Sequence, residues 1–185
     1  MAPRDIPNLI SIARILLVGP VVWALLDERS SLAMVLFAVA GISDAVDGFL
    51  AKHYHWESRL GGILDPLADK LLLIGTFLSL AWLGVIPWWL VALIVCRDLV
   101  VMGGGVVYNW LIEPFEAEPS WSSKISTTLQ IALGVAAVAH LGLYVMPDAL
   151  LVWLQWLVAL AVVVSGLGYV FEWSRRAIRH GADTH

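Results

Sequence analysis

Residues 149–171, ALLVWLQWLVALAVVVSGLGYVF, decide the fold class because the run is apolar and carries no charged residue. A helix needs about 20 consecutive apolar residues to cross the hydrocarbon core of a bilayer. Similar apolar runs precede it at residues 6–26, 32–50, 63–83, 87–112 and 125–145. Lipid offers the backbone no hydrogen-bonding partners, so each run is predicted to be a helix. The sequence therefore predicts an all-α integral membrane protein with six transmembrane helices.

The composition leads to the same class. Of the 185 residues, 60% are hydrophobic and 14% are charged, whereas a soluble domain is about 25% charged. The connections between the apolar runs are too short for a separate soluble domain, so we expect residues 1–185 to form a single membrane domain. The net charge of −4 argues against binding to nucleic acid.

The distribution of Lys and Arg predicts the orientation of the chain in the membrane, because loops that are translocated to the far side of the membrane are depleted of both residues. With six spans, the side that holds both termini carries Arg4, Lys52, Arg59, Lys124, Arg175, Arg176 and Arg179, and the opposite side carries Arg29. Both termini are therefore expected in the cytoplasm. For a bacterial chain this places the protein in the inner membrane, with the candidate active site, whose residues are given below, facing the cytoplasm.

Four carboxylates lie at the ends of two consecutive predicted helices. Asp44 and Asp47 close the second run, and Asp65 and Asp69 open the third. Spacings of three and four residues place each pair on one helix face, and a hairpin of the two helices would bring all four together. Oxygen ligands suit hard divalent ions, so we expect a site for Mg²⁺ or Mn²⁺, with two ions. The alternative is two unrelated acidic helix ends solvated by water.

Small residues and one cation accompany these acids. Gly48, Ala51 and Gly61 would let a ligand approach the backbone, and Lys52 adds a positive charge. Carboxylates, divalent ions and a cation together suit a substrate that contains a diphosphate.

The run from Asp44 to Asp69 reads D-x2-D-G-x2-A-K-x8-G-x3-D-x3-D. It resembles the signature of the CDP-alcohol phosphotransferases, the class I CDP-alcohol phosphatidyltransferase family, in which Arg usually stands at the position of Lys52. Lysine keeps the charge but lacks the bidentate fork of arginine. Within the family, the chain looks most like the eukaryotic-type cardiolipin synthases and the phosphatidylglycerophosphate synthases.

The resemblance implies six transmembrane helices and transfer of a substituted phosphate from a CDP-linked donor to an alcohol, with release of CMP. It assigns Asp69 as the base that activates the acceptor hydroxyl. The implied metal ligands are Asp44, Asp47, Asp65 and Asp69. The implied CDP-binding residues are Gly48, Ala51, Lys52 and Gly61.

The donor is expected to be CDP-diacylglycerol, and the acceptor is predicted from the fourth and fifth runs. Arg97, Asp98 and Lys124 are the candidate acceptor-binding residues, and three glycines at 103–105 stand where the glycerophosphate enzymes that the chain resembles tend to have a further arginine. We therefore favour phosphatidylglycerol as acceptor, and hence a cardiolipin synthase. Glycerol 3-phosphate is the alternative, ahead of inositol phosphate, serine or another alcohol.

Other readings stay open. Arg14 in the first run is assigned either to structural pairing or to contact with a nucleotide or lipid phosphate. A cation transporter that uses the acids as an ion site is the alternative from another class, although such proteins often show inverted repeats. The assembly is left open, with a homodimer as one option.

Overall fold

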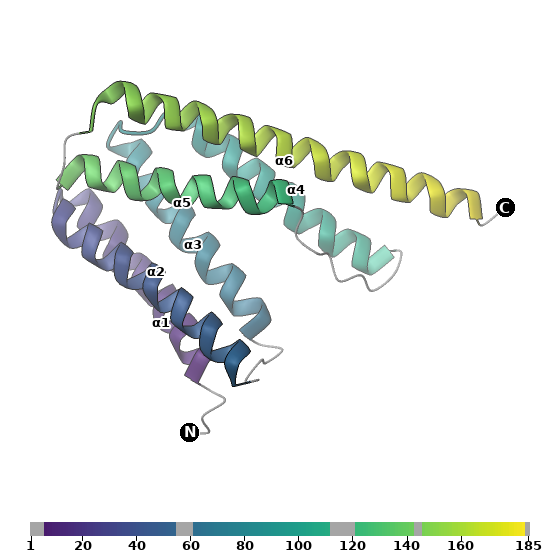
Figure 1. Ribbon diagram of the computed structural model, residues 1–185, viewed down its shortest axis with the longest axis horizontal. Helices are drawn as coiled ribbons and strands as arrows, with labels where there is room; N and C mark the ends of the chain where they lie inside the picture. Colours follow the sequence, from purple (N-terminus) through teal and green to yellow (C-terminus); the bar gives the residue numbers. More distant parts are fainter. Residues whose placement is uncertain (1–5, 55–60, 112–120, 143–145, 184–185) are drawn as a thin grey trace. The chain divides into compact units, whose positions relative to one another are not determined.

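The computed structural model describes residues 6–54, 61–111, 121–142 and 146–183. For residues 6–7, 45, 47, 50–52, 61–63, 102, 104–111 and 172–183 within these ranges, it describes the backbone alone. The described ranges form helices and turns, with no strand among them. The helices are α1 (Ile6–Leu26), α2 (Ser30–His53), α3 (Gly61–Trp82), α4 (Trp88–Leu111), α5 (Trp121–Gly142) and α6 (Asp148–Asp183) (Figure 1).

The predicted helices are confirmed, and α1 has the predicted bounds. The largest difference lies at the end of α6, which continues past Phe171 to Asp183 and is 36 residues long. At 1.5 Å per residue this helix is about 54 Å long, whereas the hydrocarbon core of a bilayer is about 30 Å thick. Polar residues after Phe171 end the apolar run but do not end the helix.

Three of the described helices contain segments long and apolar enough to cross a membrane: Asn8–Leu26, Trp121–Gly142 and Asp148–Phe171. The other three, α2 to α4, carry most of the charged residues of the predicted sites, such as Asp44, Asp65 and Arg97, whereas Lys124 lies in the candidate span of α5. The described part of the chain is therefore helical with three candidate spans, and the six-span topology remains a prediction.

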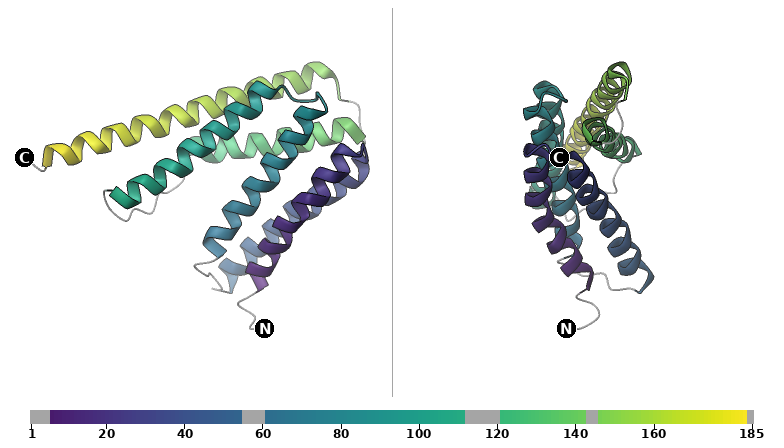
Figure 2. Two further views of the ribbon diagram at one scale, coloured as in Figure 1. Left: turned by 180° about the vertical axis from the view of Figure 1, so that it is seen from behind. Right: turned by 90° about the vertical axis from the view of Figure 1, so that its left-hand side faces the viewer.

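The first compact unit contains α1, α2, α3 and the last part of α5. In this unit α1 packs against both α2 and α3, and Figures 1 and 2 show the start of α1, the end of α2 and the start of α3 at one end. Gly75 of α3 lies so close to α1 that a Cβ atom there would be 3.1 Å from Val18 Cγ1 and 3.2 Å from Val22 Cγ2. The small residue thus permits a close helix crossing.

The second compact unit contains α4, the first part of α5 and α6, and in it α4 packs against α6. Buried Ile94 of α4 and buried Val158 and Val162 of α6 contribute to its core. The opposite face of α6 is apolar and exposed, with Leu160 and Leu167 more than 60% accessible. An apolar exposed face is expected of a helix that meets lipid.

Candidate active site

The acidic residues of α2 and α3 lie on the same helix faces as the buried apolar residues of these helices. On α2, the buried residues Ala33, Phe37 and Ala40 repeat at spacings of four and three, and Asp44 follows at the next such step. On α3, Asp65 and Asp69 precede buried Leu72 on the same face. Packing of these faces against α1 therefore directs the three carboxylates toward α1.

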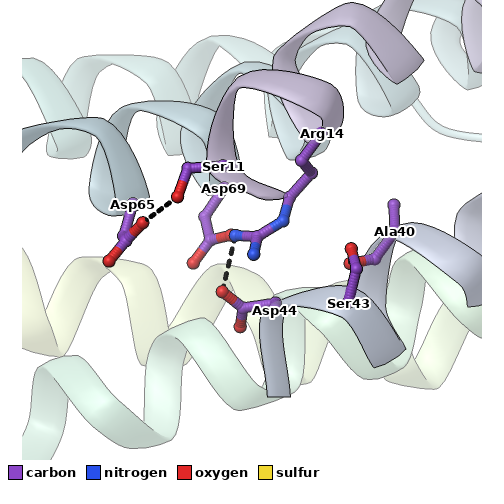
Figure 3. A network of polar contacts seen from close by, with 7 residues as sticks. All are labelled: Ser11, Arg14, Ala40, Ser43, Asp44, Asp65 and Asp69. Carbon is purple, nitrogen blue, oxygen red and sulfur yellow. Dashed lines mark hydrogen bonds and ion pairs between the residues drawn. The ribbon is translucent and has the colours of Figure 1, made fainter. Parts of the chain in front are cut away.

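Arg14 of α1 joins the carboxylates of two other helices. Its Nη1 atom donates hydrogen bonds to Asp44 Oδ1 at 2.5 Å and to Asp69 Oδ1 at 2.6 Å (Figure 3). The Arg14 side chain is completely buried, whereas the side chains of Asp44 and Asp69 are each 43% exposed. One guanidinium nitrogen thus holds one oxygen of each carboxylate, and both acidic side chains stay partly exposed.

Ser11 of α1 contacts the third carboxylate. Its Oγ atom donates a hydrogen bond to Asp65 Oδ1, and the serine itself is fully buried (Figure 3). On the neighbouring helix, Ser43 donates to the carbonyl oxygen of Ala40 at 2.7 Å, so this hydroxyl is bonded within α2. Polar contacts from α1 therefore reach Asp44, Asp65 and Asp69.

Electrostatics favours a further cation at this end of the unit. Two carboxylates that share one nitrogen repel each other, and a single guanidinium balances only one of their two negative charges. Carboxylate oxygens are the ligands that Mg²⁺ and Mn²⁺ prefer, so the chemistry of this donor set fits a divalent ion. Among the side chains that the structure describes, however, no three His, Cys, Asp or Glu residues form a group that could hold a metal ion. The side chain of Asp47, the fourth predicted ligand, lies outside the described residues.

The predicted CDP-binding residues are described only in part. A Cβ atom at Gly48 would meet no atom within 4 Å, so the backbone of α2 is open to a ligand there. The surroundings of Gly61 and the side chains of Ala51 and Lys52 lie outside the described residues. Their assignment to the nucleotide remains a prediction.

The predicted acceptor residues lie in the second unit. Arg97 is buried and donates from Nη1 to Asp98 Oδ1 at 2.8 Å. Its Nη2 atom donates to the hydroxyl of Ser123 on α5 and to that of Ser165 on α6, both at 2.7 Å. The Arg97 side chain therefore links three helices and has an anion beside it.

Lys124 has a different setting from Arg97. It is exposed, and its Nζ atom lies 5.3 Å from the centre of the Trp121 ring, a cation–π distance. Its carbonyl oxygen accepts a hydrogen bond from Thr128 at 2.9 Å. An exposed ammonium group at the start of α5 is accessible to an anionic ligand.

Sequence reasoning left Arg14 open and missed Ser11 at this site. Their spacing of three residues puts both on one helix face, and two polar residues on the buried face of an apolar helix were the available signal. Ser123 and Ser165 were also missed as partners of Arg97. Serine is common in membrane helices, so nothing in their local sequence distinguished them.

Comparisons with known proteins bear on this site. A sequence model of the CDP-alcohol phosphatidyltransferase family matches residues 4–167. The chain is 33% identical over 184 residues to a Drosophila melanogaster protein named "Probable cardiolipin synthase (CMP-forming)", covering 90% of this chain and 57% of that protein. It is 34% identical over 153 residues to the "Cardiolipin synthase (CMP-forming)" of Rattus norvegicus, covering 74% of this chain and 51% of the relative.

Relatives with the other predicted activity match as well. The Aquifex aeolicus protein named "CDP-diacylglycerol--glycerol-3-phosphate 3-phosphatidyltransferase" is 36% identical over 148 residues, covering 76% of this chain and 78% of that protein. The chain spans little more than half the length of the two animal relatives. The family match runs through α1, the acidic ends of α2 and α3, and Arg97. The chain therefore belongs to the CDP-alcohol phosphatidyltransferase family, and the part that the structure describes holds three helices that could cross a membrane.

Proposed function

We propose that this protein transfers the phosphatidyl group of CDP-diacylglycerol to phosphatidylglycerol, forming cardiolipin and releasing CMP. The observation that carries the proposal is the shared contact of Asp44 and Asp69 with Arg14, which gathers carboxylates from two helices at one place. The family match through these helices supports the same reaction class. An enzyme is favoured over a cation transporter for that reason.

The transfer needs a nucleophile and a place for its proton. The terminal hydroxyl of the acceptor attacks the phosphorus of the donor that carries the diacylglycerol, and the bond from this phosphorus to the CMP oxygen breaks. Asp69 takes the hydroxyl proton, since its side chain is 43% exposed although it contacts Arg14. CMP leaves with the electron pair of the broken bond.

The proposed ligands of a divalent ion are Asp44, Asp47, Asp65 and Asp69. Such an ion would supply positive charge beside the diphosphate as CMP leaves. Lys52 is proposed to add a second positive charge there. Gly48, Ala51 and Gly61 are proposed to line the cytidine and ribose.

The choice of phosphatidylglycerol as acceptor rests on charge. Asp98 lies 2.8 Å from Arg97, so much of the positive charge of this arginine is already balanced within the protein. A glycerol 3-phosphate headgroup carries up to two negative charges and would be matched mainly by Lys124. Phosphatidylglycerol carries one phosphodiester charge and presents a free hydroxyl.

Glycerol 3-phosphate is the second candidate, because relatives named for each of the two activities match this chain. The protein would then be a phosphatidylglycerophosphate synthase. In either case we propose six spans with both termini in the cytoplasm, in a bacterial inner membrane. A homodimer is kept as one option for the assembly.

Product analysis tests the proposed acceptor. Purified protein is incubated with CDP-diacylglycerol, Mn²⁺ or Mg²⁺, and equal concentrations of phosphatidylglycerol and glycerol 3-phosphate, and the lipids are identified by mass spectrometry. Cardiolipin is the expected product. Formation of phosphatidylglycerophosphate without cardiolipin would overturn the choice of acceptor and leave the family assignment standing.

A further inference from the structure

The buried face of α1 changes character along the helix. Near one end it is apolar, with Val21 and Leu25 buried in the core. Near the other end it presents Ser11 and Arg14, both fully buried. A buried arginine inside a predicted span is costly unless its charge is used. The polar end of α1 is therefore built for the groups that it contacts.

These contacts fix the carboxylates relative to one another. Nη1 of Arg14 lies 2.5 Å from Asp44 Oδ1 and 2.6 Å from Asp69 Oδ1, although these acids belong to different helices. Ser11 donates to Asp65 in the same region (Figure 3). Each contact engages one oxygen of its acid, and the side chains of Asp44 and Asp69 stay partly exposed.

We propose that α1 is the supporting element of the acidic site and that Arg14 and Ser11 are positioning residues. Arg14 orients Asp44 and Asp69, and Ser11 orients Asp65, so that each acid is held in place for a divalent ion to bind. The inference rests on the proposed function, in which these carboxylates hold a divalent ion. Residues that bond to metal ligands commonly fix the orientation of those ligands.

Direct binding of Mn²⁺ to the purified protein, without substrates, tests this role. Free Mn²⁺ is followed by electron paramagnetic resonance, which reports affinity independently of turnover. Arg14→Met is expected to weaken binding by roughly 10–100-fold, the usual effect of removing a partner of a metal ligand. Arg14→Lys should restore part of the affinity because it keeps the charge, and Ser11→Ala should cause a smaller loss than Arg14→Met.

Ser79→Ala is the matched control. Ser79 is a buried serine of α3 whose hydroxyl donates to the carbonyl oxygen of Gly75 at 2.8 Å, within its own helix. Its replacement removes a buried hydrogen bond and should leave Mn²⁺ affinity unchanged. A loss of affinity that is equal in Ser11→Ala and Ser79→Ala would assign the effect to packing and overturn the positioning role.

The outcomes separate this inference from the proposed function. If the unaltered protein does not bind Mn²⁺, or if Asp44→Asn binds it equally well, the metal site itself is wrong. If Asp44→Asn loses affinity while Arg14→Met binds as tightly as the unaltered protein or more tightly, the positioning role is overturned. Should Arg14→Met fail to fold, Arg14→Lys and Ser11→Ala decide, and unchanged affinity in both would overturn the inference.

Discussion

Replacing Arg97 with Met should destabilise the protein mainly through the partner that it leaves behind. The side chains of Arg97 and Asp98 are only 5% and 6% exposed, and they lie 2.8 Å apart. Removing one member of a buried ion pair deprives the other charge of that partner and costs about 3–5 kcal/mol. For a chain of this size, a melting temperature falls by roughly 2–4 °C per kcal/mol, which gives a decrease of about 6–20 °C.

Thermal unfolding in detergent, followed by tryptophan fluorescence, measures this effect. The double variant Arg97→Met/Asp98→Leu should recover much of the lost stability, because an apolar pair often replaces a buried ion pair at little cost. Arg29→Met is the matched control, since Arg29 pairs with Asp27 at 2.6 Å on the surface, where the side chains are 59% and 46% exposed. That exposed pair should contribute less than about 1 kcal/mol.

Two results would refute this reasoning. Arg97→Met could have the same melting temperature as the unaltered protein, which would mean that the buried pair contributes nothing to stability. Alternatively, the double variant could melt below Arg97→Met, which would mean that Asp98 is stable without its partner. The hydrogen bonds of Arg97 to α5 and α6 would then be the main contribution of this side chain.

Three further changes should have measurable effects. Chelation by EDTA should abolish transferase activity, and added Mn²⁺ or Mg²⁺ should restore it; undiminished turnover in EDTA would exclude the proposed metal site. Lys52→Ala should weaken donor affinity by roughly 1.5–3 kcal/mol through loss of a charge-assisted contact, whereas Lys52→Arg should preserve or improve it; an unchanged apparent KM for the donor would remove Lys52 from the diphosphate. Gly142→Ala should cost about 1–3 kcal/mol of stability, because its Cβ atom would lie 2.5 Å from Ser30 Cβ and 3.0 Å from the Ser30 carbonyl carbon; an unchanged melting temperature would contradict this packing.

The helices were predictable because hydropathy and turn residues mark most of their ends. α1 ends at Leu26, directly before the charged turn in which Glu28 has a φ of 58°. The end of α6 could not be predicted from hydropathy, since a helix continues through polar residues once its first turns are formed. Hydropathy reports where a span ends, and α6 is longer than its span.

Spacing along single helices was enough to predict which acidic residues share a helix face, but not which residues of other helices they contact. Asp44 and Asp69 were expected on facing helix ends, and the structure places both at Arg14. The role of Arg14 could not be assigned, because its partners depend on how α1 packs against two other helices. Arg97 and Asp98 illustrate the same limit, since adjacent residues do not normally face each other on a helix, yet these two bond at 2.8 Å.

The most direct test of the central claim compares Asp69→Asn with the unaltered protein in a reaction that records CMP and lipid product together. Asparagine keeps an oxygen that can accept from Arg14 but does not take the acceptor proton. The account predicts equal amounts of CMP and cardiolipin from the unaltered protein, and a loss of roughly 10²–10⁴-fold in turnover for Asp69→Asn. Turnover of Asp69→Asn within a few-fold of the unaltered protein would contradict the claim that this carboxylate acts in the transfer.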